Sequence, residues 1–269
     1  MAPIAANDSG SGAERDPQSG PRSAADRLLA VLAAFDQDNQ TLTLTAIAHR
    51  AELQLTTAHR LVGSLTRWGA LERDDSGGYH IGLRLWETAA LAPRGVVLRQ
   101  VAMPFLEDLY EATHENVHLA VRDGLDVVYI ERISGRSAVG VRSRVGARWP
   151  LHATGVGLVL LAHGDTELQE RVLAGPLRAF TPHTVTDPAR LRRMLAEARH
   201  TGTAVSDRQI TDDALSVAAP VRGAGAGGAV VAAVSVVVHA ENARPQQLAP
   251  AVRVAARGIS RALGWTPSG

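Results

Sequence analysis

The chain has 269 residues, of which 45% are hydrophobic and 20% are charged, with a formal net charge of +1. This length and composition allow two ordinary globular domains. The sequence contains no cysteine, which excludes disulfides, thiolate catalysis and cysteine metal sites. All of its basic residues except the histidines are arginines. The small net charge gives no general attraction to nucleic acid, so such binding depends on local clusters of charge.

The first 21 residues are rich in Ala, Gly, Ser, Pro and Asp and contain almost no large apolar side chains. Such a segment cannot bury enough surface to order itself, and it lacks the apolar core of a signal peptide. The longest apolar run, over residues 229–238, is about half the length that a membrane span needs. We therefore predict a disordered tail over 1–21 and a cytoplasmic protein without a membrane segment.

Two short helices separated by a tight turn are predicted within residues 43–65. Thr43 can cap the first helix and Thr56 the second. The second helix has an apolar stripe with i, i+3, i+4, i+7 spacing. Its members are Ala58, Leu61, Val62 and Leu65. The pattern fits a helix-turn-helix, and it also fits an ordinary helical hairpin with a solvated polar face.

The segment that follows favours the helix-turn-helix. Gly69 suits the end of a helix, and residues 71–73 and 79–81 form two short strands joined by a tight turn. An amphipathic helix that starts after Ser23, which can cap it, provides a scaffold. These features predict a winged helix-turn-helix domain over residues 22–82.

The polar face of the second helix can reach phosphates and base edges of DNA. Arg60 is the strongest candidate for a contact, and Thr56 and Thr57 can fix the start of the helix on the DNA backbone. Carboxylates slightly outnumber arginines over residues 22–92, so we expect modest non-specific affinity. The predicted DNA-binding residues are Thr56, Thr57, His59, Arg60, Ser64, Arg67, Arg73, Tyr79 and His80.

The rest of the chain predicts a linker and a second domain. Residues 83–92 form a helical pattern that a Pro-Arg-Gly sequence interrupts, so the linker covers 83–95. The second domain, over 96–265, alternates strands and helices without a regular βαβ repeat, which predicts an α+β fold with an antiparallel sheet. Its predicted helices lie at 96–114, from about 154, at 165–174, 188–201 and 249–263. Its predicted strands lie at 117–121, 127–132, 138–145, 203–209, 214–221 and 229–238.

Four stretches in this order resemble the IclR family of bacterial transcription regulators, over essentially residues 22–265. LQLTTAHRLVGSLTRWG is similar to the family's recognition helix, and YHIGLRL to the end of its wing. WPLHATGVGLVLLA resembles the family's pocket helix, and SVAAPVRGAGAGGAVVAAVSV resembles its paired final strands. The resemblance implies a GAF-like effector-binding domain, dimers that often pair into tetramers, and control of transcription by a small molecule, by repression or activation.

Two positions depart from the family pattern. Where the family usually has glycine in the turn between the two helices, this chain has Glu52, so we expect that turn to be looser or strained. An acidic pair is common in the family shortly after the strand at 203–205, and here residues 206–209 read Ser-Asp-Arg-Gln. The effector chemistry of acid-binding relatives therefore does not transfer directly.

The resemblance places an effector pocket in the second domain. Its residues are Val141, Trp149, Gly155, Val156, Ser206, Ala214, Ser216, Ser235 and Val237. Independently of the family, the sequence Thr154-Gly155-Val156-Gly157 opens a helix and leaves backbone N–H groups that suit a carboxylate. The same glycines also fit close packing of the helix on a sheet, which is the alternative interpretation.

The mapped pocket residues are mostly apolar, and none of them is basic. They therefore favour a small monocarboxylate or neutral amide with an aromatic or short aliphatic body over a dicarboxylate. Trp149 offers a flat face for an aromatic ring, and it can also act as a plug. An inward turn of a nearby arginine would change this expectation; the candidates are Arg142, Arg144, Arg148 and Arg208.

Two other classes of protein remain open. An enzyme could use His152, His183, Asp207 and the pocket serines, but no nucleophile elbow, His-Glu-x-x-His motif or metal-ligand spacing is present. A protein-interaction module with a winged helix is the other class.

Our prediction is a regulator with no cofactor and no metal, which binds double-stranded DNA as a homodimer or as a dimer of dimers, on an operator with inverted half-sites. The predicted dimer contact in the N-terminal half is the linker helix, through Leu85, Trp86, Ala89 and Leu91.

Overall fold

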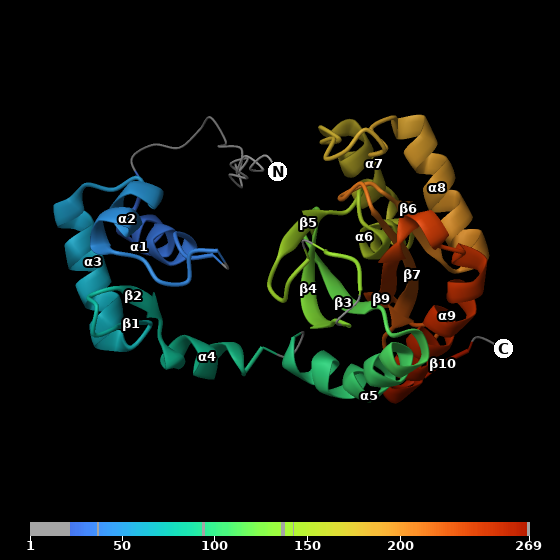
Figure 1. The fold of residues 1–269 in the computed structure, drawn as a ribbon, viewed down its shortest axis with the longest axis horizontal. Coiled ribbons are helices and arrows are strands. Elements are labelled where there is room, and N and C mark those ends of the chain that lie inside the picture. Colours follow the sequence, from blue (N-terminus) through green and yellow to red (C-terminus); the bar gives the residue numbers. More distant parts are fainter. Residues whose placement is uncertain (1–21, 37, 93–94, 136–137, 142, 268–269) are drawn as a thin grey trace, which may run out of the picture. The chain divides into compact units, whose positions relative to one another are not determined.

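The computed structural model describes residues 22–36, 38–92, 95–135, 138–141 and 143–267. The chain divides into two compact units, with the division between Leu91 and Ala92 (Figure 1). The predicted tail over 1–21 lies outside the described residues, as do Pro93 and Arg94 in the predicted linker. Among the described residues, no helix is long and apolar enough to cross a membrane.

The first unit is a winged helix-turn-helix, followed by a short helix. Its elements are α1 (Ala24–Ala33), α2 (Leu44–Arg50), α3 (Leu55–Trp68), β1 (Leu71–Arg73), β2 (Tyr79–Ile81) and α4 (Leu83–Ala89). The apolar sides of α1, α2 and α3 meet in one core, which the wing closes through Leu71. An isolated bridge between Leu42 and Tyr79 ties the wing to the start of α2. The strands of the wing lie where the sequence predicted them.

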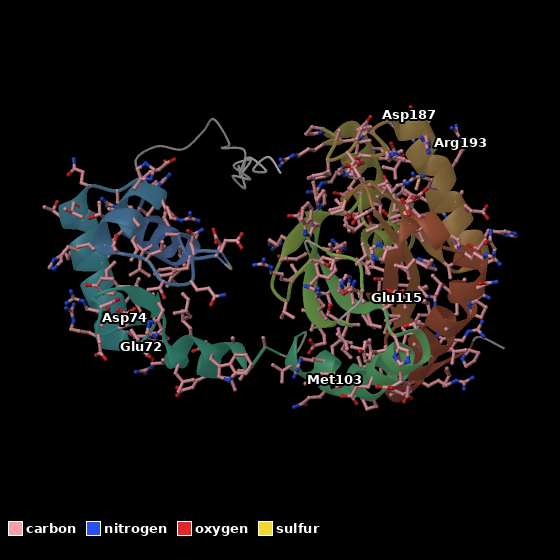
Figure 2. The ribbon with its side chains drawn as sticks, in the orientation of Figure 1. Glu72, Asp74, Met103, Glu115, Asp187 and Arg193 are labelled. Carbon is pink, nitrogen blue, oxygen red and sulfur yellow. The ribbon has the colours of Figure 1, made fainter. Side chains whose placement is uncertain are left out.

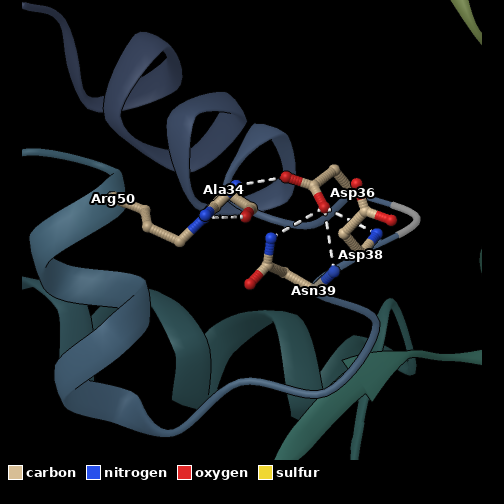
Figure 3. Close-up of polar contacts among 5 residues, drawn as sticks. All are labelled: Ala34, Asp36, Asp38, Asn39 and Arg50. Atoms are coloured by element: carbon tan, nitrogen blue, oxygen red, sulfur yellow. Dashed lines mark hydrogen bonds and ion pairs between the residues drawn. The ribbon is translucent and has the colours of Figure 1, made fainter. Parts of the chain in front are cut away.

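Side-chain caps and a polar cluster fix the helices of this unit. Ser23 caps α1, because its Oγ accepts the backbone N–H of Asp26 at 3.1 Å, and this confirms the predicted cap. Between α1 and α2, the Asp36 carboxylate accepts the backbone N–H groups of Asp38 and Asn39 and pairs with Arg50 (Figure 3). Arg50 also donates to a carbonyl at the end of α1, at 2.6 Å. The cluster therefore joins the end of α1 to the end of α2.

The start of α3 differs from the prediction. Thr43 caps α2, with its Oγ1 3.2 Å from the backbone N of Ala46, but Thr56 does not cap α3. The helix begins at Leu55, and Gln54 occupies the cap position without a side-chain hydrogen bond. The turn is shorter than predicted because the N–H of Leu53 bonds back to the carbonyl of Ala48 at 2.9 Å. The chain therefore re-enters a helix two residues earlier.

The second unit is a six-stranded sheet with helices on both faces. In chain order its elements are α5 (Val96–Thr113), β3 (Asn116–Asp123), β4 (Asp126–Ile133), β5 (Arg148–Pro150), α6 (Gly155–Ala162), α7 (Thr166–Ala174), α8 (Pro188–Thr201), β6 (Ala204–Asp207), β7 (Ala214–Arg222), β8 (Gly225–Ala226), β9 (Val230–His239), η1 (Ala240–Asn242), α9 (Pro245–Ala262) and β10 (Trp265–Thr266). The strand order is β5-β4-β3-β9-β7-β6, and all neighbours are antiparallel.

The two faces of this sheet support separate cores. One core packs α6, α7 and α8 against the sheet, and the other packs α5 and α9 against the opposite face (Figure 1). This architecture confirms the predicted α+β class with an antiparallel sheet. Successive side chains of a strand point to opposite faces, and here helices cover both faces of the sheet. This explains why β3, β7 and β9 appear as almost continuous apolar runs in the sequence.

One predicted strand of this unit is different in the structure. The described residues of 138–145 form no strand; a turn follows, in which the N–H of Gly146 bonds to the carbonyl of Tyr129 at 2.8 Å. The strand that pairs with β4 is instead β5, which begins at Arg148. The glycine-rich connection between β7 and β9 contains β8, which pairs with β10 in parallel.

Candidate DNA-binding surface and effector pocket

Helix α3 has one buried face and one exposed polar face. The predicted stripe is buried in the core of the first unit, at Ala58, Leu61, Val62 and Leu65. On the other face Thr56, His59, Arg60 and Arg67 are exposed, and Thr57 and Ser64 are half-buried. The six predicted residues of this helix therefore share an accessible surface.

The residues on this surface differ in whether their side chains already make hydrogen bonds or ion pairs within the protein. Arg67 donates to Ser64 Oγ at 3.1 Å, and this hydroxyl donates to the carbonyl of Arg60 at 3.1 Å. Within the described part of the chain, the guanidinium of Arg60 and the imidazole of His59 have no hydrogen-bond or ion-pair partner. These two side chains can therefore meet DNA without breaking an existing contact.

The predicted residues of the wing are engaged with their neighbours. The guanidinium carbon of Arg73 lies 5.6 Å from the centre of the Tyr79 ring. His80 pairs across the strands with Glu72, with 3.4 Å between Nε2 and Oε2. Glu72 also accepts the N–H of Leu83 at 2.8 Å, so a wing residue caps α4. Figure 2 labels Glu72, near the base of the wing.

A cavity opens between the sheet and the start of α6. It encloses about 470 Å³ of empty space, part of it open to solvent. Its lining comes from β3, β4, β5, α6, β6, β7 and β9 and from the segments between them. The lining residues are His118, Tyr129, Val141, Ser143, Trp149, Ala153, Thr154, Gly155, Ser206, Gln209, Ile210, Thr211, Ala214, Ser216 and Val237.

The cavity brings together most of the predicted pocket residues. Those that line it are Val141, Trp149, Gly155, Ser206, Ala214, Ser216 and Val237. Val156 and Ser235 do not line it and are about 1% exposed. Val156 belongs to the core that packs α6, α7 and α8 against the sheet. Ser235 lies on β9, between its strand partners His118 and Ala218.

Several lining residues were not predicted, among them His118, Tyr129, Ser143 and Gln209. They come from strands and connections whose sequences look like ordinary core or loop. One signal was available for His118, because it is a polar side chain in the middle of an otherwise apolar strand. A buried polar side chain needs a partner, and such a residue commonly faces a cavity or a polar network.

His118, Tyr129 and Ser143 form a polar but uncharged wall. The Nε2 of His118 lies 3.1 Å from Ser143 Oγ, and the imidazole meets the Tyr129 ring edge-on, with centroids 5.2 Å apart. Burial, with a smaller contribution from the charge of Arg132, lowers the pKa of His118 to about 3. Burial also raises the pKa of Tyr129. At neutral pH this wall therefore offers hydrogen bonds without net charge.

The start of α6 leaves backbone donors next to the cavity. Thr154 caps the helix, because its Oγ1 accepts the N–H of Gly157 at 3.0 Å. Within the described residues the N–H groups of Gly155 and Val156 have no acceptor, as expected for a first turn. A Cβ on Gly155 would lie 2.6 Å from Ser216 Oγ, and one on Gly157 would lie 2.4 Å from the carbonyl of Leu151. Both glycines are thus needed for packing, and Gly155 also lines the cavity.

The described arginines that lie near the pocket in sequence do not line it. Arg148 pairs with Asp123 and Asp126, and Arg208 pairs with Asp207 at 3.0 Å. Arg144 is exposed, and Arg142 lies outside the described residues. Among the described residues the lining therefore contains no arginine and no carboxylate. Trp149, which lines the cavity, meets Phe180 edge-on, with ring centroids 5.4 Å apart.

The rival enzyme interpretation needed His152, His183 and Asp207 to act together with the pocket serines. His152 is buried, and its Nε2 donates to the carbonyl of Arg178 at 3.0 Å, so its contact is structural. His183 is exposed, and Asp207 is engaged with Arg208. None of the three lines the cavity.

Two sequence models match the chain in succession: the IclR helix-turn-helix domain over residues 24–75, and the bacterial transcriptional regulator IclR C-terminal domain over residues 92–261. The chain belongs to the IclR family. Its order of DNA-binding and C-terminal domains is that of an IclR-family regulator, which confirms the resemblance noted from the sequence.

Individual relatives agree with this assignment. The HTH-type transcriptional regulator XynR of Escherichia coli (strain K12) is 31% identical over 245 residues, which cover 89% of this chain and 96% of XynR. The transcriptional repressor AllR of Klebsiella pneumoniae is 30% identical over 249 residues, 91% of each chain. The crystal structure of an IclR homologue from Microbacterium hydrocarbonoxydans, complexed with 4-hydroxybenzoate, is 39% identical with a TM-score of 0.85 and covers 90% of this chain and 99% of its own. This IclR-family protein is a transcription regulator and not an enzyme.

Proposed function

We propose that this IclR-family regulator binds an operator with inverted half-sites as a dimer in the cytoplasm and responds to a small aromatic monocarboxylate or the corresponding amide. The observation that carries the effector assignment is the cavity at the start of α6, which combines free backbone donors with an uncharged, largely apolar lining.

The carboxylate of the effector is assigned to the first turn of α6. The unpaired N–H groups of Gly155 and Val156 and the positive end of the helix favour a single negative charge or a carbonyl oxygen. Because the described lining has no arginine and its histidine, His118, is uncharged at neutral pH, a second carboxylate would be buried without a counter-charge, which is costly. The site therefore favours a monoanion or an amide over a dicarboxylate.

The body of the effector is assigned to the rest of the cavity. Val141, Trp149 and Val237 supply apolar and aromatic surface. The neutral wall of His118, Tyr129 and Ser143 suits a hydroxyl group, because an uncharged imidazole and a hydroxyl can each donate or accept a hydrogen bond. The similar protein from Microbacterium hydrocarbonoxydans was crystallised with 4-hydroxybenzoate, which has this combination of groups. A short aliphatic monocarboxylate is the second candidate.

Calorimetry of the full-length protein tests the effector class. We expect benzoate, 4-hydroxybenzoate or benzamide to bind, and oxalate not to bind. Ser216→Val should weaken aromatic carboxylate binding by about tenfold, the value of one hydrogen bond, because Ser216 lines the cavity. Ser235→Val is the matched control, one strand away and outside the lining, and should leave the affinity unchanged. Tight binding of oxalate with equal affinity in both variants would contradict the assignment.

The dimer contact is proposed on α4 and the segment after it. Of the residues predicted for this contact, Leu85 packs against the core of its own unit. Trp86 is 66% exposed and Leu91 is 81% exposed, and Leu83 adds to the same segment at 64%. Neighbouring exposed apolar side chains of this size are typical of an interaction surface, and a second copy of this chain is the partner that an inverted repeat requires.

A further inference from the structure

One exposed apolar side chain lies at the start of α3. Leu55 is the first residue of the helix, and 51% of it is exposed. It belongs neither to the buried core of its unit nor to the partly buried side chains that pack against this core, whereas Leu53, two residues earlier, does pack there. Nothing in the described part of the first unit therefore explains a leucine at this position.

The surroundings of Leu55 are polar and accessible. Gln54, before it, makes no side-chain cap bond, and Thr56, after it, is exposed. His59 follows one helical turn later, at i+4, on the same side of the helix as Leu55. The apolar side chain thus stands at the N-terminal end of the polar face that carries Arg60.

In helix-turn-helix proteins the first residues of the recognition helix lie against base edges in the major groove. The apolar group on those edges is the C5-methyl of thymine. We infer that Leu55 contacts a thymine methyl in each half-site of the operator and so selects an A·T pair there. The inference rests on the proposed operator binding and adds to it a residue that reads sequence without a hydrogen bond.

The test uses uracil, which differs from thymine by that methyl alone. An operator is first selected from random duplexes with the full-length protein, and each symmetric pair of thymines in it is then replaced by uracil. At one such pair, we expect wild-type affinity to fall by about fourfold per half-site, the value of one buried methyl group. In Leu55→Ala the thymine and uracil operators should bind almost equally. Leu125→Ala, an exposed leucine in the other unit, should retain the wild-type ratio.

Each alternative outcome overturns the inference in a recognisable way. If no uracil replacement changes wild-type affinity, or if Leu55→Ala keeps the full penalty, Leu55 does not read a methyl. If Thr56→Ser, which removes a neighbouring methyl, abolishes the penalty and Leu55→Ala does not, then Thr56 is the reader. If Leu55→Ala lowers the affinity for the thymine operator and for the uracil operator by the same factor, the role of Leu55 is structural. A lowered melting temperature of the variant would confirm this. Failure of the wild type to select any operator would instead refute the proposed function, and the inference with it.

Discussion

Glu52 adopts a φ of 54° in the turn between α2 and α3. This left-handed region is unfavourable for residues with a Cβ and is populated readily by glycine. Arg22 supports the strained turn, because it donates to the carbonyl of Ala51 at 2.9 Å and pairs with the Glu52 carboxylate at 2.9 Å. The strain expected from the departure at this position is thus present, together with a partner that partly offsets it.

A pair of substitutions separates the backbone strain from the ion pair. Both Glu52→Gly and Glu52→Ala remove the carboxylate, but only glycine fits a φ of 54° without strain. We therefore expect the glycine variant to be more stable than the alanine variant by about 1 kcal/mol. Urea unfolding of the two proteins gives this difference. Equal midpoints, or a more stable alanine variant, would show that the turn relaxes instead of storing strain.

We expect His118 to make the stability of the second unit depend on pH. Burial lowers its pKa from the ordinary 6.5 to about 3 in the folded protein, so between these values the unfolded chain binds a proton that the folded chain does not. Stability is then complete above pH 6.5 and falls as the pH decreases toward 3. From pH 7 to pH 5 we expect a loss of roughly 2 kcal/mol from this residue.

Chemical denaturation at pH 7 and pH 5 tests this expectation with His118→Gln. The variant should lose less stability on acidification than the wild type, by roughly those 2 kcal/mol. A residual dependence in the same direction should remain, because burial also lowers the pKa of His152 and His163. The same loss in both proteins would mean that His118 is accessible to protons in the folded state.

At the scale of one element, α3 carries the DNA-binding prediction. Arg60 is exposed on the polar face and has no side-chain partner within the described residues. Arg60→Ala should cost roughly 1–3 kcal/mol of specific operator affinity if the guanidinium reads a base. Arg192→Ala, on the surface of α8 and paired with Glu170, is the matched control. Fluorescence anisotropy at two salt concentrations measures both; operator affinity unchanged in Arg60→Ala would refute the assignment.

The elements differ in how far their sequences determined them. Helix α3 and the strands of the wing were predictable because local periodicity and turn residues agree with the tertiary contacts. The segment at 138–145 was not, because its apolar residues serve the cavity and the core: Val139 is buried and Val141 lines the cavity. Apolar content alone does not distinguish a strand from an irregular segment whose side chains line a cavity or fill a core.

The residues of the cavity, too, could be predicted only in part from the sequence. Its helix-capping donors could be predicted from four consecutive residues around Thr154 and Gly155, since a helix start is a local feature. The wall formed by His118, Tyr129 and Ser143 could not, because it depends on strand register: β3 and β4 shift register between Leu119 and Ala120, beside His118. That irregularity is set by the sheet as a whole and leaves no clear trace in the sequence.

At the scale of the whole molecule, the two proposed activities lie on separate units. The surface of α3 belongs to the first unit, and the cavity belongs to the second. In a regulator of this kind, effector binding must change the free energy of operator binding. Thermodynamic linkage then requires that operator binding change the free energy of effector binding as well. Such coupling is the central claim, since binding of either ligand alone would also be compatible with unconnected functions.

The most direct measurement is a quantitative footprint on the selected operator, titrated with full-length protein in the absence and presence of saturating 4-hydroxybenzoate. We predict protection of two half-sites related by inversion, with centres about one helical turn or a multiple apart. We also predict a shift of the binding midpoint by about 5- to 150-fold when the aromatic acid is present. An asymmetric footprint, or a midpoint that does not move with the effector bound, would contradict this account.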